Sequence, residues 1–104
     1  MRHLKPLILV ILCIAPLGAA EVVINQKDRA FSKSELTLHS GDTIVFKNFD
    51  EVTHNVFSVT EGMEFDLRRQ APGGSSSVPF TKVGVAEVRC SIHPKMKLIV
   101  TVQK

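Results

Sequence analysis

Seven consecutive residues near the C-terminus carry the side chains best suited to chemistry. They read Cys-Ser-Ile-His-Pro-Lys-Met, so that Cys90, His93 and Met96 are each separated by two residues. A thiolate, an imidazole and a thioether form a soft donor set, which suits copper far better than magnesium, calcium or manganese. A fourth ligand must come from elsewhere in the chain, and His54 is the obvious candidate. We therefore expect His54, Cys90, His93 and Met96 to hold one copper ion.

Two histidines and one cysteine in a trigonal arrangement, with a methionine at a longer distance, make up the blue-copper electron-transfer site. Cu(I) prefers soft sulfur ligands and low coordination, whereas Cu(II) prefers nitrogen ligands and tetragonal geometry. The mixed set is a compromise that both oxidation states tolerate, so little has to move when an electron arrives. The sequence therefore predicts a protein that carries single electrons and is not an enzyme.

Three other interpretations of these residues stay open at this point. A copper-delivery or copper-storage module would use the same soft ligands, but it would bind Cu(I) without needing a reversible Cu(II) state. Zinc also accepts two histidines and a cysteine, although the thioether argues against it. A cysteine–histidine nucleophilic enzyme fits poorly, because Cys90 and His93 share one tight loop and no orienting carboxylate or oxyanion donor is evident.

Other chemically capable residues have simpler explanations. His39 precedes a Ser-Gly turn and is expected to be a surface residue rather than a ligand. Met63 is expected to pack beneath a loop rather than to supply a second, weak metal site. Two basic pairs are expected to be solvated surface charge rather than a docking patch for an acidic partner: Arg68-Arg69 and Lys95-Lys97.

Short strands must position the four ligands. Residues 84–90 alternate between two faces, and Cys90 lies on the face that carries the small apolar side chains. Residues 96–102 alternate in the same way, with Met96 on the apolar face. Cys90 and Met96 are therefore expected to face inward at the facing ends of two strands, and His54 is expected to begin another strand.

About seven short strands with turn signals between them, and almost no helix signal, predict an all-β fold, an antiparallel β-sandwich. Residues 61–77 contain several glycines, serines and a proline, which favours a loop, with one helical turn near residues 64–69. The strands are expected at residues 21–25, 35–39, 43–48, 54–59, 78–81, 84–90 and 96–102.

The first twenty residues are expected to be an export signal. A basic start at residues 2–5 precedes an apolar run over residues 7–14, and Ala19 and Ala20 suit a signal peptidase. The apolar run is too short to span a bilayer as a helix, which needs roughly 20 such residues. We therefore expect residues 1–20 to be removed and residues 21–104 to form one domain.

Cleavage would change both the charge and the cysteine content. Loss of Arg2 and Lys5 lowers the net charge from +3 to +1, so a nucleic-acid partner is not implied. Loss of Cys13 leaves Cys90 as the only cysteine, which excludes an internal disulfide. A domain this small often needs a disulfide or a bound metal for stability, and a metal bound through an otherwise unpaired cysteine would meet that need.

The ligand segments resemble those of the plastocyanin/azurin family of cupredoxins. The short interval between His93 and Met96 is most similar to that of amicyanin, and the stretch that includes Phe65-Asp66 is similar to small plastocyanin-like proteins associated with methylamine utilisation. The residues that carry the resemblance are His54-Asn55-Val56, Phe65-Asp66, Cys90, His93-Pro94 and Met96.

The resemblance implies an eight-stranded Greek-key β-sandwich with one copper near one end. It places His54, Cys90, His93 and Met96 on the four copper ligands, and it implies a hydrogen bond between Asn55 and Ser91. The chain has no tyrosine and no strong acidic patch, so a docking mode based on those features is not implied. The expected protein is a periplasmic monomer with protein redox partners and no membrane insertion after signal cleavage.

Overall fold

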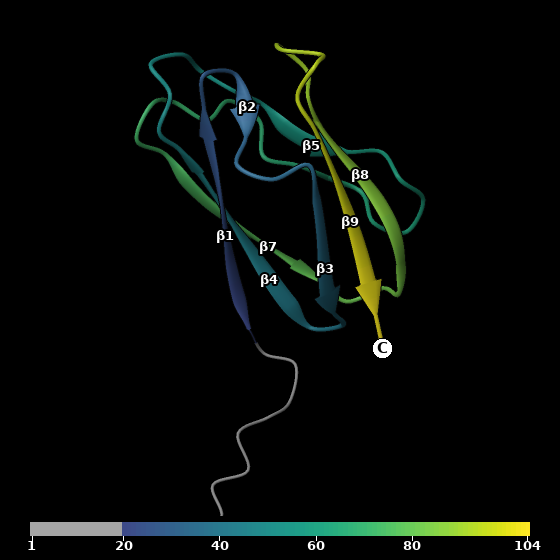
Figure 1. Cartoon of the computed structure of the whole chain (residues 1–104). Helices are drawn as coiled ribbons and strands as arrows, with labels where there is room; N and C mark the ends of the chain where they lie inside the picture. The colour runs from purple at the N-terminus through teal and green to yellow at the C-terminus, as the bar shows by residue number, and fades with distance from the viewer. Residues whose placement is uncertain (1–19) are drawn as a thin grey trace, which may run out of the picture.

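The computed structural model describes residues 20–104, which form two β-sheets packed face to face (Figure 1). No helix occurs in this range, so the all-β sandwich expected from the sequence is confirmed. The strands are β1 (Glu21–Lys27), β2 (Ala30–Phe31), β3 (Glu35–His39), β4 (Asp42–Asn48), β5 (Val56–Ser58), β6 (Phe65–Asp66), β7 (Ser75–Phe80), β8 (Gly84–Cys90) and β9 (Lys97–Gln103).

The strand order defines a four-stranded sheet, β2-β1-β4-β7, and a five-stranded sheet, β3-β9-β8-β5-β6. Most neighbouring strands are antiparallel, but β1 pairs with β4 and β3 pairs with β9 in parallel. The sequence predicted antiparallel pairing throughout, so these two parallel pairs differ from the expectation. The chain crosses from the four-stranded to the five-stranded sheet between β2 and β3 and returns between β3 and β4, so β4 pairs with β1 rather than with β3.

Alternating side chains build the core between the sheets. Along β4 every second residue points inward, and Ile44 and Phe46 are completely buried. Val88 of β8 and Leu98 of β9, which are cross-strand partners, are also completely buried. Full burial of one such side chain contributes about 1.5–3 kcal/mol. The expected two-face pattern of β8 and β9 is therefore confirmed, and it holds the facing ends of these strands in register.

Two tight turns have backbone conformations that matter for the fold. Gly41, between β3 and β4, has a φ of 101°, a region that side chains with a Cβ rarely adopt. Asp28 and Arg29 form the two-residue turn between β1 and β2, with φ values of 51° and 56°. Positive φ at both central residues matches the twist of a two-residue hairpin. This turn directs the backbone N–H of Arg29 toward the side chain of Asp50.

Residues 61–77 differ from expectation. The sequence predicted a loop with a helical turn near residues 64–69, but residues 65–66 form β6, which pairs antiparallel with β5. The β7 strand begins at Ser75, three residues earlier than expected. Hydrogen bonding to β5 satisfies the backbone better than an isolated helical turn, whose nucleation is unfavourable. The two-residue β2 strand was also not anticipated.

The predicted ligands lie at strand ends or just beyond them. Cys90 ends β8, Met96 immediately precedes β9, and His54 stands two residues before β5 in an isolated bridge with Gln70. The ligand loop, residues 91–96, joins β8 to β9 at the upper end in Figure 1, whereas β1 begins at the opposite end. The expected export signal and its cleavage lie outside the described residues, apart from Ala20. Within residues 20–104 no helix is long and apolar enough to cross a membrane.

Candidate metal centre

Antiparallel pairing brings the ligand segments to one point. Val56 of β5 is the cross-strand partner of Cys90, so the residues just before Val56 lie beside the end of β8. Arg89 pairs with Lys97, which places the start of β9 on the other side of the same strand end. Cys90 is only 2% exposed, as its inward position predicts. The segment just before β5, distant in sequence, and the start of β9 therefore both lie beside the Cys90 end of β8.

Three donor atoms form a compact triangle. The Nδ1 atoms of His54 and His93 are 3.1 Å apart, and the Sγ atom of Cys90 lies 3.7 Å from the first and 3.9 Å from the second. The point equidistant from all three is about 2.1 Å from each, close to typical bonds of about 2.0–2.1 Å from metal to imidazole and about 2.3 Å from metal to thiolate. The cluster is thus the right size for a single ion.

Met96 closes the ligand loop from the other side. Its side chain is buried, with an exposed fraction of 1%, and its position before Lys97 continues the inward face of β9. Its backbone N–H donates a hydrogen bond of 3.0 Å to the carbonyl of His93, which makes the loop turn tightly. These contacts keep the thioether at the same end of the core as the triangle.

His54 is completely enclosed, and its far nitrogen contacts a carboxylate. The Nε2 atom lies 3.0 Å from Oδ2 of Asp50. Because a carboxylate only accepts hydrogen bonds, the proton of the neutral ring resides on Nε2. The Nδ1 atom then carries no proton, so its lone pair is available to a metal ion within the triangle. Asp50 therefore selects the tautomer of His54 that can bind a metal.

Asp50 is itself held by the β1–β2 turn. The same Oδ2 atom accepts a hydrogen bond of 2.8 Å from the backbone N–H of Arg29. This bond and the one from His54 lower the pKa of Asp50 to about 2, against the opposing effect of burial. The sequence interpretation missed Asp50; a carboxylate four residues before a candidate ligand was the only available signal.

A cluster of buried amides supports His54 from behind. The backbone of His54 exchanges hydrogen bonds of 3.1 Å and 2.7 Å with Gln70. Asn48 donates to the carbonyl of Gln70 and accepts from the backbone of Asp50. Gln26 and Gln70 are joined through their side-chain amides. These buried groups are hydrogen-bonded to one another, so the wall behind His54 is polar and fixed in position.

Asn55 connects the cysteine to the ligand loop. Its backbone N–H points at the Cys90 sulfur over 3.3 Å, and its carbonyl accepts the Ser91 N–H over 3.1 Å. The Ser91 hydroxyl donates to the Asn55 side-chain oxygen over 2.7 Å. The Asn55–Ser91 hydrogen bond that the family resemblance implied is therefore confirmed.

His93 is the more accessible of the two histidines. Its ring is only partly buried, whereas His54 has no exposed surface. Partial burial, the neighbouring His54 ring and the Arg29 cation lower the pKa of His93 below its ordinary value of 6.5. The ring borders a hollow of about 420 Å³ between the β1–β2 turn and the ligand loop. Ile92, 49% exposed, lies beside it.

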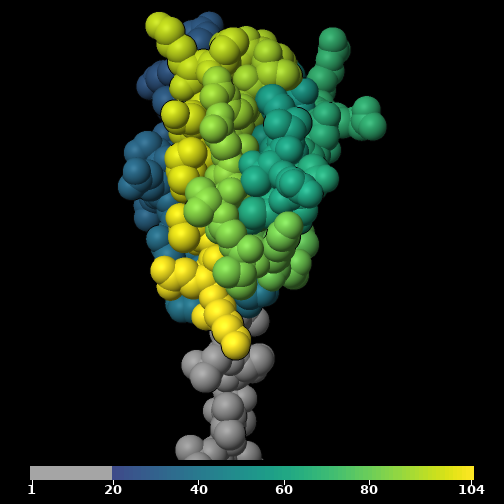
Figure 2. All heavy atoms as spheres, turned by 90° about the vertical axis from the view of Figure 1, so that its right-hand side faces the viewer, coloured from purple at the N-terminus to yellow at the C-terminus, as the bar shows by residue number. Residues whose placement is uncertain are grey.

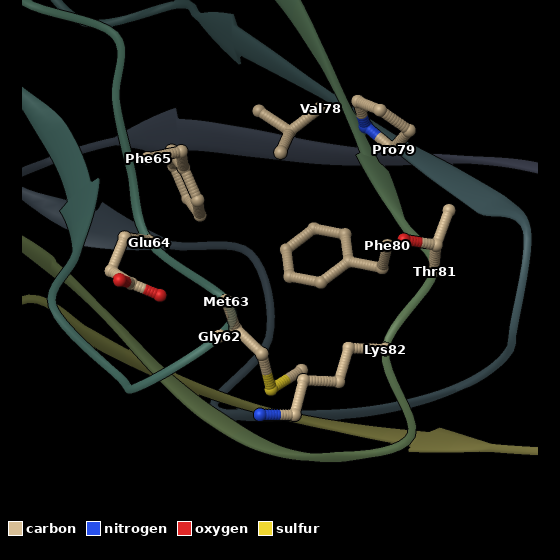
Figure 3. A pocket seen from close by; sticks show the side chains of 9 residues that line it. All are labelled: Gly62, Met63, Glu64, Phe65, Val78, Pro79, Phe80, Thr81 and Lys82. Atoms are coloured by element: carbon tan, nitrogen blue, oxygen red, sulfur yellow. The ribbon is translucent and has the colours of Figure 1, made fainter.

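The other sequence candidates lie away from this cluster. Met63 is buried in the hydrophobic core, where it borders a second hollow of about 210 Å³ together with Phe80 and Lys82 (Figure 3). His39 is exposed at the end of β3, and its backbone N–H donates to Asp42. The expectations that Met63 is a packing residue and His39 a surface residue are confirmed.

The family assignment follows from comparison with known proteins. Residues 19–103 match the model for "Copper binding proteins, plastocyanin/azurin family", so the chain belongs to this family of cupredoxins. The sequence resemblance is thereby confirmed. A search of curated protein sequences gives no match.

Solved structures agree with this assignment. A variant of amicyanin in its Cu(I) form is 27% identical, with a TM-score of 0.72 and coverage of 83% of each chain. A copper-containing nitrite reductase from Thermus scotoductus is 25% identical with a TM-score of 0.75; the match covers 81% of this chain but only 22% of the enzyme. A purple cupredoxin from Nitrosopumilus maritimus, 24% identical, shares the fold with a TM-score of 0.70 and coverage of 79% and 99%.

The donor set fits the metal of the family. Two imidazole nitrogens and one thiolate meet at bonding distance around one point, and a buried thioether follows on the same loop. Imidazole and soft sulfur ligands together suit copper. The chain therefore carries a single copper site, and copper would supply reversible one-electron chemistry there.

Proposed function

We propose that this protein is an exported type 1, or blue, copper protein that carries single electrons between redox partners. His54, Cys90, His93 and Met96 are the proposed ligands, with Met96 as the weak axial one. The observation that carries the proposal is the triangle of two imidazole nitrogens and one thiolate sulfur, with sides of 3.1, 3.7 and 3.9 Å.

The rigidity of the site favours electron transfer. His54 is held through its backbone by Gln70 and through its ring by Asp50. Cys90 is anchored at the end of β8 and receives the Asn55 N–H. Ligands that are held in place change position little between Cu(I) and Cu(II), which lowers the cost of each transfer. A site that only stored Cu(I) would not need this restraint.

Electrons are proposed to enter and leave through His93. Its ring is the ligand that borders solvent, in the hollow next to Ile92 and Pro94. An apolar surface around a metal ligand lets a partner approach closely after water is displaced. Pro72, which is exposed on a loop beside the end of β4, is a candidate for the rim of this contact surface.

The remaining features of the proposal concern the whole protein. Residues 1–20 act as the export signal, and residues 21–104 form the copper domain in the periplasm. The domain acts as a monomer and as a carrier rather than as an enzyme, with protein redox partners, without nucleic acid and without insertion into a membrane. The one cluster of potential metal ligands found among residues 20–104 supports the role of a carrier of single electrons.

Copper delivery or storage is the alternative, because the partly exposed His93 would also let a partner chaperone reach the metal. The two functions differ in the oxidation states that they need. Cu(II) added to purified metal-free protein is expected to give an intense blue charge-transfer band and an EPR spectrum with narrow copper hyperfine splitting. A colourless protein that binds only Cu(I) would favour delivery or storage.

Two substitutions test the ligands within that experiment. Cys90→Ser is expected to remove the blue band while the protein stays folded, since the band requires a thiolate bonded to Cu(II). Met96→Leu is expected to keep the band but to alter the EPR spectrum. Met63→Leu is the matched control, because this methionine lies in the core outside the cluster. A blue band that persists in Cys90→Ser contradicts the ligand assignment.

A further inference from the structure

An exposed aspartate is connected to the metal cluster through one intermediate residue. Asn55 Nδ2 donates a hydrogen bond of 2.8 Å to Oδ1 of Asp66, in β6. On its other side, Asn55 Oδ1 accepts the hydroxyl of Ser91 over 2.7 Å. Ser91 directly follows Cys90 and opens the ligand loop. A continuous hydrogen-bonded row therefore runs from the loop to an edge strand 25 residues away in sequence.

The sheet geometry explains why these residues meet. Phe57 of β5 pairs with both Arg89 of β8 and Asp66 of β6. Side chains alternate along a strand, so Asn55 lies on the same face as Phe57, two residues further toward the metal. That face is the outer one of the five-stranded sheet, which Figure 2 shows with the ligand loop at the top. The row thus crosses the copper end of the sheet.

The carboxylate gives the row its direction. A serine hydroxyl can donate or accept, so Ser91 by itself does not decide which way the Asn55 amide points. An ionised carboxylate only accepts, so the NH2 group of Asn55 must face Asp66 and its oxygen must face Ser91. The hydrogen bonds from Asn55 and from the Arg68 backbone keep the pKa of Asp66 below its ordinary value, and the group is therefore charged near neutral pH.

Asn55 also contacts the copper-binding sulfur. Its backbone N–H points at the Cys90 Sγ over 3.3 Å, and its carbonyl accepts the Ser91 N–H. Hydrogen bonds around the cysteine sulfur tune the potential of blue-copper sites. An N–H directed at the thiolate withdraws negative charge from it, which favours Cu(I) and raises the reduction potential. Any group that holds Asn55 in place therefore acts on the copper indirectly.

We infer that Asp66 is a positioning residue for the copper centre, which orients the Asn55 amide and thereby fixes the N–H contact to the Cys90 sulfur. This role rests on the proposed function, since it acts on a bound copper. Asp66 also makes a local contact, because the same Oδ1 accepts the Arg68 N–H over 2.7 Å. Such a bond two residues ahead is an Asx turn, and it helps to hold Arg68 at its φ of 57°. The test must separate these two roles.

Three variants of the copper-loaded protein make this separation. Asp66→Asn keeps an acceptor oxygen for both Asn55 and Arg68. Asp66→Ser keeps an acceptor for the turn, because a serine hydroxyl forms the same type of turn, but it is too short to reach Asn55. Asp66→Ala removes both contacts. Glu64→Ala is the matched control, since it removes an exposed carboxylate two residues away that belongs to no part of the row.

The reduction potential, the energy of the blue band and the copper EPR spectrum are the readouts. We expect Asp66→Ser and Asp66→Ala to shift the Cu(I)/Cu(II) ratio toward Cu(II) by about two- to tenfold at a fixed potential, the range of one hydrogen bond. Asp66→Asn and Glu64→Ala are expected to match the unchanged protein. If Asp66 stabilised only the turn, Asp66→Ala would instead lower the thermal stability, and Asp66→Ser would change neither the thermal stability nor the potential.

A double substitution completes the test. In an Asn55→Ala background, Asp66→Ala is expected to have no additional effect on the potential, because the group through which it acts is gone. Additive effects, or an Asp66→Ser protein with an unchanged potential and spectrum, overturn the inference while leaving the copper function intact. A wild-type protein that shows no blue band overturns the proposed function as well, and that result does not depend on any Asp66 variant.

Discussion

The Nε2 atom of His54 lies 3.0 Å from Oδ2 of Asp50, and that oxygen also accepts the backbone N–H of Arg29 over 2.8 Å. One carboxylate oxygen thus links the turn between β1 and β2 to the buried His54 ring by two hydrogen bonds. The bond decides which nitrogen of His54 carries its proton, and the negative charge makes the imidazole a stronger donor to a metal. Asp50 therefore orients the imidazole of His54 for metal binding.

Asp50→Asn should weaken copper binding. Asparagine keeps an acceptor oxygen for Arg29 and His54 but removes the charge that strengthens the imidazole. We expect the affinity for Cu(II) to fall by about 10- to 100-fold and the reduction potential to rise, as measured by competition with a chelator and by voltammetry. Glu51→Gln, an exposed neighbour, is the control.

The pH dependence gives this prediction a second test. Because the pKa of Asp50 is about 2, its carboxylate is charged in the native protein throughout the range from pH 5 to 8. The difference in affinity between Asp50→Asn and the unchanged protein should therefore be constant across that range. A difference that grows with pH would show that another group is responsible.

Removal of copper should lower the thermal stability of the protein. A ligand that binds only the native state stabilises it by about 4 kcal/mol when its free concentration is a thousand times the dissociation constant. In a domain of this size, 1 kcal/mol changes Tm by about 4–8 °C. Calorimetry should therefore place the Cu(II) form at least about 15 °C above the metal-free form. Equal melting temperatures would contradict copper binding to the native state.

The His93 ring should titrate below the ordinary pH range of histidine in the metal-free protein. Its pKa is lowered because burial, His54 and Arg29 all disfavour the charged ring. A folded-state pKa below the unfolded value of about 6.5 means that the unfolded chain binds more protons between the two. The contribution of His93 to the free energy of unfolding is therefore complete above pH 6.5, and it is lost as the pH falls through the folded-state pKa.

NMR titration of the ring protons measures this directly. Arg29→Gln should move the His93 midpoint upward, while Lys27→Gln, a change in the same hairpin that is not among the causes of the shift, should leave it in place. A midpoint at or above 6.5 in the unchanged protein would contradict the environment described for His93.

Arg89 should restrain the ligand loop from outside the site. Its guanidinium donates a hydrogen bond of 3.0 Å to the carbonyl of Pro94 and pairs with Glu87. Arg89→Met should therefore release copper about two- to tenfold faster, as expected for one lost hydrogen bond. Stopped-flow mixing with a chelator measures the rate. Lys97→Met is the control, because Lys97 is the cross-strand partner of Arg89 on the same outer face. Equal rates in both variants would mean that only surface charge matters.

The sequence alone determined the chemistry of the site and the strands that carry it. The spacing of Cys90, His93 and Met96 lies within one short loop, so it could be interpreted without knowing the fold. The two-residue alternation of β8 and β9 is equally local, because neighbouring side chains of any strand point to opposite faces. The alternation was correctly predicted, as was the hydrogen bond from Ser91 to Asn55 that the family resemblance implied.

The tertiary structure decided what surrounds the ligands. The contact of Asp50 with His54 depends on the β1–β2 turn, and the contact of Asp66 with Asn55 depends on the pairing of β5 with β6. Sequence patterns predict which face of a strand is apolar, but they do not say which strands become neighbours. That choice follows from packing two sheets around one core, which is why candidate copper ligands could be named from the sequence, whereas the contacts of Asp50 with His54 and of Asp66 with Asn55 could not.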